Sequence, residues 1–389
     1  MADTLRVATI GYGFMGRAHA QAWATIGRHF DLPLTPVMAV ICGRDADKAE
    51  AARQTLGYDE ASDDWRAVVE RDDIDLVDIC TPGDSHHDIA LAALAAGKHV
   101  LCEKPLANTV AEAEEMAVAA ERARADGVRS MVGFNYRRVP ALAHARRLIA
   151  DGRLGTIHHV RAVYLQDWIA DPEFPLVWRL QAEHAGSGSL GDIGAHILDL
   201  AEHLTGQQIA EVTGLTHTFV TERPLTEGSE GLSAAGGGTE RGPVTVDDAA
   251  LALARLSGGA LATFEATRFA VGRKNGLRIE VNGSSGSIAF DLERLNELEL
   301  HTTDQPAAEQ GFRRILMTEG DHPYAGAWWP PGHIIGWEHS FSHEFVDLIR
   351  DIAEGRDPSP SFADGLHVQR VLDAVQRSAD VGGWITIDG

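Results

Sequence analysis

Short apolar runs alternate with helical patterns through the first third of the chain. The apolar runs cover residues 5–10, 37–42, 74–80, 98–102 and 130–135. Apolar residues with helical spacing lie between and after these runs, at about 14–27, 46–56, 86–96 and 109–125. Because strands that alternate with helices form parallel sheets with right-handed crossovers, the pattern predicts an α/β fold of the Rossmann type.

A different pattern begins after about residue 135. A helix is predicted at 140–150, and segments in which apolar and polar residues alternate come next. These segments are 157–165, 212–219, 249–256, 261–266, 277–282, 287–290 and 297–300. Strands without helices between them predict a large, mostly antiparallel open sheet. Two further helices are predicted near 338–354 and 363–379, and the glycine-rich stretch 228–242 predicts a loop.

The change of pattern indicates two domains, because 389 residues exceed the usual size of a single core. We expect an N-terminal Rossmann domain at residues 1–134 and a C-terminal α/β domain at 135–389. The last two helices belong to the second domain in this division, and they are free to pack back toward the first.

Charge and cysteine usage narrow the class of protein. The 57 acidic residues outnumber the 34 basic ones, which gives a formal net charge of −23. Such a surface repels nucleic acid and anionic lipid, so neither is expected as a partner. The three cysteines, Cys42, Cys80 and Cys102, each lie at the end of an apolar run, and they lack the spacing of metal ligands. This is the pattern expected of buried, reduced cysteines in a cytoplasmic protein. Neither a secretory signal nor an apolar run of about 18 residues is visible, and the expected location is cytoplasmic.

The first apolar run ends in a G-x-G-x-x-G turn that leads directly into a helix. In this turn Gly11 permits the tight bend, Gly13 lets the backbone approach a pyrophosphate, and Gly16 lets the helix lie close to the strand. The free N–H groups at the helix start, around Phe14 and Met15, point at the anion. The motif predicts that the chain binds NAD or NADP.

The end of the second predicted strand bears on which dinucleotide binds. An NAD enzyme usually places an acidic residue there to hold the adenosine ribose. Here Gly43 and Arg44 occupy that place, and Arg44 could pair with a 2′-phosphate or stack on adenine. Asp45 lies one or two positions later and could still reach the ribose. The pattern slightly favours NADP and leaves NAD open.

Two later loops are predicted at the same carboxyl edge of the sheet, where ligands of open α/β sheets bind. The first carries Thr81, Pro82 and His86, and His86 is expected to begin a helix beneath the nicotinamide side. The second carries Glu103, Lys104 and Pro105. A lysine directly after a buried strand suits proton exchange with a substrate hydroxyl, and the proline after it aims the side chain. Glu103 could orient Lys104 or close on the cofactor.

These motifs, in this order, resemble those of the Gfo/Idh/MocA oxidoreductases. The resemblance rests on the glycine turn, on Thr81-Pro82 with His86, on Glu103-Lys104-Pro105, and on Gly191-Asp192-Ile193-Gly194-Ala195-His196. It covers essentially the whole chain. It implies NAD(P)-linked hydride transfer on a sugar or polyol hydroxyl, and a second domain whose open sheet often joins subunits into a homodimer or homotetramer.

The resemblance also implies the catalytic residues Lys104, Asp192 and His196. Asp192 is expected to begin a helix, so that positions 192 and 196 share a helix face. His196 then takes the hydroxyl proton as hydride leaves the carbon, and Asp192 holds the substrate or the imidazole. His196, Asp199 and His203 also share one face, which leaves a metal site as an alternative. Hydride transfer needs no metal, and none is predicted.

A further group of residues has the chemistry of a sugar pocket. Amide, carboxylate, guanidinium and aromatic side chains mixed within a few residues suit a ligand with polar edges and apolar faces. The candidates are Tyr136, Arg137, Gln166, Asp167, Trp168 and Arg179, with Asn135 expected on the cofactor side. Trp178 is either core or pocket wall. Within the family, this group resembles NAD-using members that oxidise a sugar at C3.

The sequence therefore predicts an NAD(P)-dependent dehydrogenase that oxidises a secondary hydroxyl of a cyclic sugar, anhydrosugar or inositol-like polyol. Two alternatives stay open at this point. One is a non-catalytic regulator that senses NAD(P), although such a sensor needs no proton relay. The other is a glycosidase that uses tightly held NAD for transient oxidation.

Overall fold

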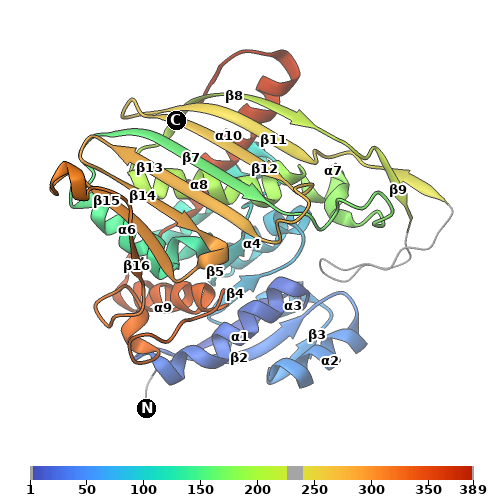
Figure 1. Ribbon diagram of the computed structural model, residues 1–389. Helices are drawn as coiled ribbons and strands as arrows, with labels where there is room; N and C mark the ends of the chain where they lie inside the picture. Colours follow the sequence, from blue (N-terminus) through green and yellow to red (C-terminus); the bar gives the residue numbers. More distant parts are fainter. Residues whose placement is uncertain (1–2, 226–239, 388–389) are drawn as a thin grey trace.

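The computed structural model describes residues 3–225 and 240–387, and its N-terminal part is built on a six-stranded sheet (Figure 1). The strand order is β3-β2-β1-β4-β5-β6, and all pairings among these strands are parallel. The strands are β1 (Thr4–Ile10), β2 (Thr35–Cys42), β3 (Glu60–Ser62), β4 (Leu76–Ile79), β5 (His99–Glu103) and β6 (Ser130–Gly133). The predicted Rossmann-type sheet is confirmed.

Helices connect these strands close to the predicted positions. They are α1 (Phe14–His29), α2 (Ala46–Leu56), α3 (Trp65–Val69), α4 (His86–Ala95) and α5 (Val110–Arg124). The edge strand β3 and the short helix α3 were not predicted, because three residues without an apolar run carry no strand pattern. The N-cap residue of α1 is Gly13, which has no side chain to occupy the first N–H groups of the helix.

The second part of the chain forms a nine-stranded sheet in the order β16-β15-β14-β13-β7-β12-β11-β8-β17. Its strands are β7 (Ile157–Leu165), β8 (Ile209–His217), β11 (Ala249–Leu256), β12 (Leu261–Thr267), β13 (Gly276–Gly283), β14 (Gly286–Asp291), β15 (Glu297–Thr302), β16 (Arg313–Leu316) and β17 (Ile385–Thr386). The β7–β12 pair is parallel and the other pairs are antiparallel, so the predicted mostly antiparallel sheet is confirmed.

A separate two-stranded ribbon extends beyond this sheet. It pairs β9 (Glu222–Pro224) with β10 (Arg241–Pro243). The predicted loop 228–242 falls mostly outside the described residues, and its last two residues, Arg241 and Gly242, belong to β10.

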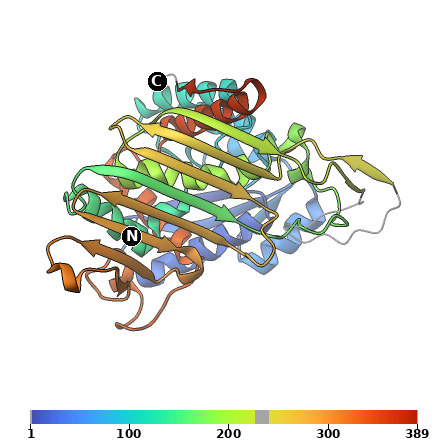
Figure 2. The ribbon, with the colours of Figure 1, turned by 45° about the horizontal axis from the view of Figure 1, so that its top comes forward.

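In the part of the chain that the structure describes, helices cover only one face of the large sheet. The helices α6 (Pro140–Ala150), α8 (Ala195–Thr205) and α10 (Phe362–Val381) lie between this sheet and the first one (Figure 1). Figure 2 turns the other face toward the viewer. This open face carries four leucines that are about half exposed, namely Leu215, Leu251, Leu253 and Leu261. Their strands β8, β11 and β12 are neighbours, and Leu215 pairs directly with Leu251.

The C-terminal helices return to the first sheet. The helix α9 (His339–Glu354) packs against α1, where the ring of Phe345 stacks on Trp23 at 4.2 Å between centroids (Figure 1). The helix α10 contacts α5. The two parts of the chain are therefore joined by packed helices, while the exact boundary at 134/135 stays a prediction. Among the described helices, none combines the length and hydropathy needed to cross a membrane.

Candidate active site

A cavity of about 1390 Å³ extends from the glycine turn to the inner side of the large sheet. Most of the residues predicted from the sequence line it. They are Gly11, Gly13, Phe14, Met15, Gly43, Arg44, Asp45, Thr81, Pro82, His86, Glu103, Lys104, Asn135, Tyr136, Gln166, Arg179, Asp192 and His196. The structure thus brings residues from 11 to 196 in the chain to one place.

The glycine turn is shaped by close backbone contacts. Gly11 has φ of +110°, and a Cβ atom on it would lie 2.7 Å from the carbonyl oxygen of Cys80. Gly16 lies outside the cavity lining, and its Cβ would lie 2.0 Å from the carbonyl oxygen of Gly11, so a side chain would push helix and strand apart. Gly13 faces open space. The turn therefore has room for an anion beside the uncapped start of α1.

The residues at the end of β2 differ from those of an enzyme in which a carboxylate at this strand end binds the ribose. Tyr12 covers Gly43, where an added Cβ would lie 2.1 Å from the tyrosine ring. The Asp45 carboxylate caps α2 by accepting a hydrogen bond from the Lys48 backbone at 3.1 Å. Arg44 and Lys48 line the cavity beside it. The charge available at this end of the cavity is therefore partly positive.

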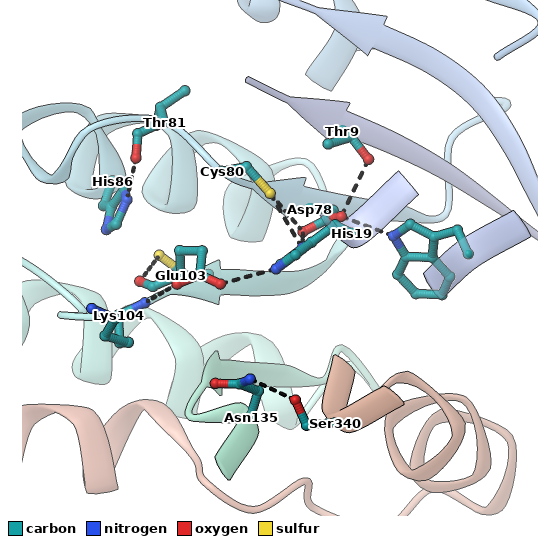
Figure 3. A network of polar contacts seen from close by, with 12 residues as sticks. Thr9, His19, Asp78, Cys80, Thr81, His86, Glu103, Lys104, Asn135 and Ser340 are labelled. Carbon is teal, nitrogen blue, oxygen red and sulfur yellow. Dashed lines mark hydrogen bonds and ion pairs between the residues drawn. The ribbon is translucent and has the colours of Figure 1, made fainter. Parts of the chain in front are cut away.

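Two predicted side chains hold neighbouring elements together. The buried ring of His86, at the start of α4, places its nitrogens 2.9 Å from the Thr81 carbonyl oxygen and 3.0 Å from that of Pro105. Asn135 donates its amide N–H to Ser340 of α9 at 2.7 Å (Figure 3). His86 thus links the loops that follow β4 and β5, Asn135 links the segment after β6 to α9, and both residues line the cavity.

Lys104 meets Asp192 in the middle of the cavity. The Nζ atom donates to the backbone oxygen of Asp192 at 2.5 Å and lies 3.5 Å from its Oδ1. The Lys104–Pro105 peptide bond is cis. Asp192 sits in a π-helical turn, Leu190–Gly194, and His196 is the second residue of the helix α8 that follows. The expectation that Asp192 begins a helix is therefore corrected to a π turn that leads into one.

Charge decides the protonation of this cluster. Burial by itself would raise the pKa of Asp192, but Lys104, Arg268 and Arg179 outweigh it and hold the pKa at about 2. Burial lowers the pKa of His196 well below 6.5, and Lys104 adds to this against the opposing charge of Asp192. Near neutral pH, Asp192 is ionised and His196 is neutral. A neutral imidazole beside a cation can accept a proton.

A chain of hydrogen bonds lines the far end of the cavity. Tyr164 donates to Oδ1 of Asn275 at 2.7 Å, so its oxygen accepts from the hydroxyl of Tyr136 at 2.8 Å. The indole N–H of Trp337 donates to Tyr136 at 3.1 Å, and Gln166 donates to Asn275 at 2.9 Å. The direction of every bond in the chain is thus fixed, which makes this wall rigid.

Three residues predicted as substrate contacts do not line the cavity, and the structure gives each of them a partner. Arg137 donates to the Asp199 carboxylate through Nε at 2.9 Å in a buried ion pair. Asp167 pairs with Lys274 at 2.8 Å. Trp168 packs against Phe174 in a separate apolar cluster. The Arg137 pair also occupies the aspartate of the alternative metal set, His196, Asp199 and His203.

Sequence reasoning missed several residues of the cavity. Arg268 is fully buried, and its guanidinium lies 3.3 Å from Oδ2 of Asp192. A charged residue directly after the alternating strand 261–267 is a signal that could have found it. Trp178, left open between core and wall, lines the cavity with Arg179 stacked on it at 4.3 Å. Trp337 stacks on Phe14 at 5.6 Å between ring centroids, and no local pattern marks it.

Comparison with known proteins agrees with this architecture. One family model, described as an oxidoreductase family with an NAD-binding Rossmann fold, matches residues 5–134. The model of the GFO/IDH/MocA C-terminal domain matches residues 142–289. The protein is thus an oxidoreductase with a dinucleotide-binding domain. More particularly, the chain belongs to the Gfo/Idh/MocA family.

Individual relatives match along the whole chain. The levoglucosan dehydrogenase of Pseudarthrobacter phenanthrenivorans is 42% identical, over 99% of this chain and 98% of the relative. A crystal structure of an oxidoreductase domain protein from Kribbella flavida is 60% identical with a TM-score of 0.95, and each chain is fully covered. A levoglucosan dehydrogenase in complex with NADH and levoglucosan is 40% identical with a TM-score of 0.93, again over 100% of both chains.

The electrostatics of the cluster predict how His196 titrates. Because burial and Lys104 both lower its pKa, His196 should stay neutral as the pH falls through 6.5 and take a proton only well below it. In Lys104→Ala one cause is removed, so the pKa of His196 should rise toward 6.5. An NMR pH titration of the imidazole signals, assigned with a His196→Asn variant, measures both values. Titration of parent His196 at or above 6.5 would contradict this description.

Proposed function

We propose that the protein is an NAD-dependent dehydrogenase that oxidises a secondary hydroxyl of a cyclic sugar or anhydrosugar by hydride transfer. The observation that carries the proposal is the meeting of Lys104, Asp192 and His196 in the same cavity as the glycine turn. The 42% identity to a levoglucosan dehydrogenase supports an anhydrosugar as the first substrate to test. An inositol-like polyol is the next class.

The residues of the cavity divide the work of such a reaction. When bound, the dinucleotide would accept the hydride from the substrate carbon. Neutral His196 accepts the hydroxyl proton, while the ammonium of Lys104 stabilises the negative charge that develops on the oxygen. Ionised Asp192 holds Lys104 in place and accepts a hydrogen bond from the substrate. Gln166, Arg179 and Trp178 offer polar and flat surfaces for the sugar ring.

Lys104→Ala should lower kcat by about 100-fold or more, because losing one donor aimed at the negative charge that develops on oxygen costs about 10²–10³. The assay follows absorbance of the reduced cofactor across a panel of anhydrosugars, sugars and inositols. Lys98→Ala is the matched control, since Lys98 precedes the same strand at its other end and donates to the Arg71 carbonyl at 2.6 Å. That variant should keep the parent kcat per folded molecule. Parent-like cofactor reduction by Lys104→Ala would exclude the assigned role.

The same panel separates the two other readings of the fold. A non-catalytic regulator would bind the dinucleotide and reduce none with any substrate. A glycosidase that oxidises its substrate only transiently would release sugar products without net formation of reduced cofactor. The Lys104, Asp192 and His196 cluster argues against the regulator, because oxidation of a hydroxyl requires a route for its proton and a sensor needs none, while the product assay separates the dehydrogenase from the glycosidase.

We propose further that the enzyme accepts both NAD and NADP. The support is that Asp45 caps α2, while Arg44 and Lys48 line the cavity at the end of β2, the strand end that contacts the adenosine ribose in this fold class. The parent should therefore show kcat/KM values for the two cofactors within about tenfold of each other, about 1.4 kcal/mol. Arg44→Asp should move this ratio by more than about tenfold toward NAD, while Lys98→Ala leaves it unchanged. A parent that excludes NADP entirely would refute the proposal.

We also propose that the protein is a cytoplasmic homodimer or homotetramer joined through the open face of the large sheet. The support is the group of half-exposed leucines on β8, β11 and β12. They form an apolar surface on the face of the large sheet that is turned toward the viewer in Figure 2 and that no described helix covers. The double change Leu251→Arg and Leu253→Arg should yield single chains in analytical ultracentrifugation. Val118→Arg, at a half-exposed position of α5, should leave the assembly intact. A parent that sediments as one chain would contradict this.

A further inference from the structure

A second group of buried charged side chains joins α1 to β4 and β5 (Figure 3). His19 of α1 lies between Asp78 of β4 and Glu103 of β5, and all three are buried. The Nδ1 atom of His19 is 2.8 Å from Oδ1 of Asp78, and its Nε2 atom is 2.9 Å from Oε1 of Glu103. His19 and Asp78 lie outside the cavity lining, so the proposed reaction does not use them directly.

The hydrogen bonds fix the charge of His19. Asp78 also accepts from Trp23 at 2.8 Å and from Thr9 at 3.2 Å, so it acts only as an acceptor. Each nitrogen of His19 faces a carboxylate and must donate to it, which makes the ring an imidazolium. Burial lowers the pKa of His19, but Asp78 and the neighbouring Cys80 outweigh it and raise the pKa well above 6.5.

A metal ion is not needed to explain this cluster. His19, Asp78 and Cys80 have the side chains of a metal site. However, the Nδ1 atom of His19 lies 2.8 Å from Asp78 and 3.2 Å from the Cys80 sulfur, which are hydrogen-bond distances. Ligands at about 2.0–2.3 Å around a tetrahedral metal would lie farther apart. The second nitrogen is also turned to Glu103.

The cluster reaches the active site through Glu103. Its second oxygen, Oε2, accepts the backbone N–H of Lys104 at 3.1 Å (Figure 3). Gly133 of β6 closes the other side, where an added Cβ would lie 3.2 Å from Oε1 of Glu103. One carboxylate thus joins the buried imidazolium to the main chain of the residue whose Nζ atom bonds Asp192.

The groups that face His19 from α9 leave its charge in place. The rings of Phe341 and Phe345 pack on it at 5.3 and 5.0 Å. Glu344 is fully buried, and neither of its oxygens has a hydrogen-bond partner among the described residues; burial, together with the charge of Glu103, raises its pKa to about 8. Glu344 is therefore protonated at neutral pH. The carboxylates that balance His19 are Asp78 and Glu103.

We propose that His19 is a positioning residue for Lys104. By holding Glu103, it fixes the backbone of Lys104 and directs its ammonium toward Asp192 and the reacting hydroxyl. This inference rests on the proposed function, since it assigns Lys104 a part in the reaction. His19 does not contact the substrate end of the cavity, because the side chains of Glu103 and Lys104 lie between that end and the His19 ring.

His19→Gln keeps one donor and removes the charge. It should lower kcat by about 10- to 100-fold and leave the KM for NAD within about twofold, because the change misplaces Lys104 and leaves the glycine turn unaltered. Trp23→Phe is the matched control, since it removes another donor to Asp78 but keeps an aromatic ring against Phe345. It should keep the parent kcat even with a lower melting temperature.

A double-mutant cycle separates this role from a merely structural one. In the Lys104→Ala background, His19→Gln should cost less than about twofold in kcat, because the residue through which it acts is gone. The proposal would be overturned if the losses in kcat of the two single variants multiplied in the double variant, or if His19→Gln alone kept the parent kcat. If His19→Gln fails to fold, Glu103→Gln carries the same cycle, because it breaks the same connection from the other side.

A readout without turnover distinguishes failure of this inference from failure of the proposed function. After reductive ¹³C-methylation, the Lys104 signal, identified by its loss in Lys104→Ala, should shift in His19→Gln and stay in place in Trp23→Phe. An unchanged Lys104 signal in His19→Gln overturns the positioning role. A parent that reduces no cofactor on the whole sugar panel, with the shift present, instead refutes the dehydrogenase assignment alone.

Discussion

The contact between Lys104 and Asp192 is the interaction on which the arrangement of the site depends. Lys104 directly follows a strand of the parallel sheet, and Asp192 belongs to the turn before α8, which packs on the large sheet. The bond therefore joins the two halves of the chain inside the cavity. Because Arg268 approaches the same carboxylate from the end of β12, Asp192 fixes the position of two cations at once. A substrate hydroxyl group that enters between these two cations meets an electrostatic field that is in place before the reaction begins.

The charges of the cavity explain why a carboxylate and an imidazole with ordinary pKa values in water take opposite roles here. Three cations hold Asp192 ionised, and burial together with one of them, Lys104, keeps His196 neutral. Such a cluster costs solvation energy, which only close pairing offsets. The rigid chain from Trp337 through Tyr136 and Tyr164 to Asn275 supplies a wall that does not compete for these charges, because all its donors are already directed.

Local sequence patterns were enough to predict the long strands, most helices, and the residues that end strands at the cavity. Strand ends are defined by apolar runs, so Gly11, Thr81 and Lys104 could be placed at one edge. Arg137, Asp167 and Trp168 are next to cavity residues in the sequence but do not line the cavity themselves, and their role as substrate contacts stays a prediction. Their actual partners, Asp199, Lys274 and Phe174, are set by tertiary packing. Trp337 was missed for the converse reason, since it reaches Phe14 only through the return of the C-terminal segment.

The two ends of the cavity are built on different physical terms. At the glycine turn, backbone contacts decide the shape: Gly11 and Gly16 have no space for a side chain, and Gly13 leaves the start of α1 open. Such a site recognises a pyrophosphate but carries little information about the rest of the dinucleotide. That information comes from the end of β2. There the Tyr12 ring covers Gly43, and the Asp45 carboxylate caps α2. The turn therefore accounts for dinucleotide binding, and the side chains at the end of β2 are the basis of the proposal that both NAD and NADP are accepted.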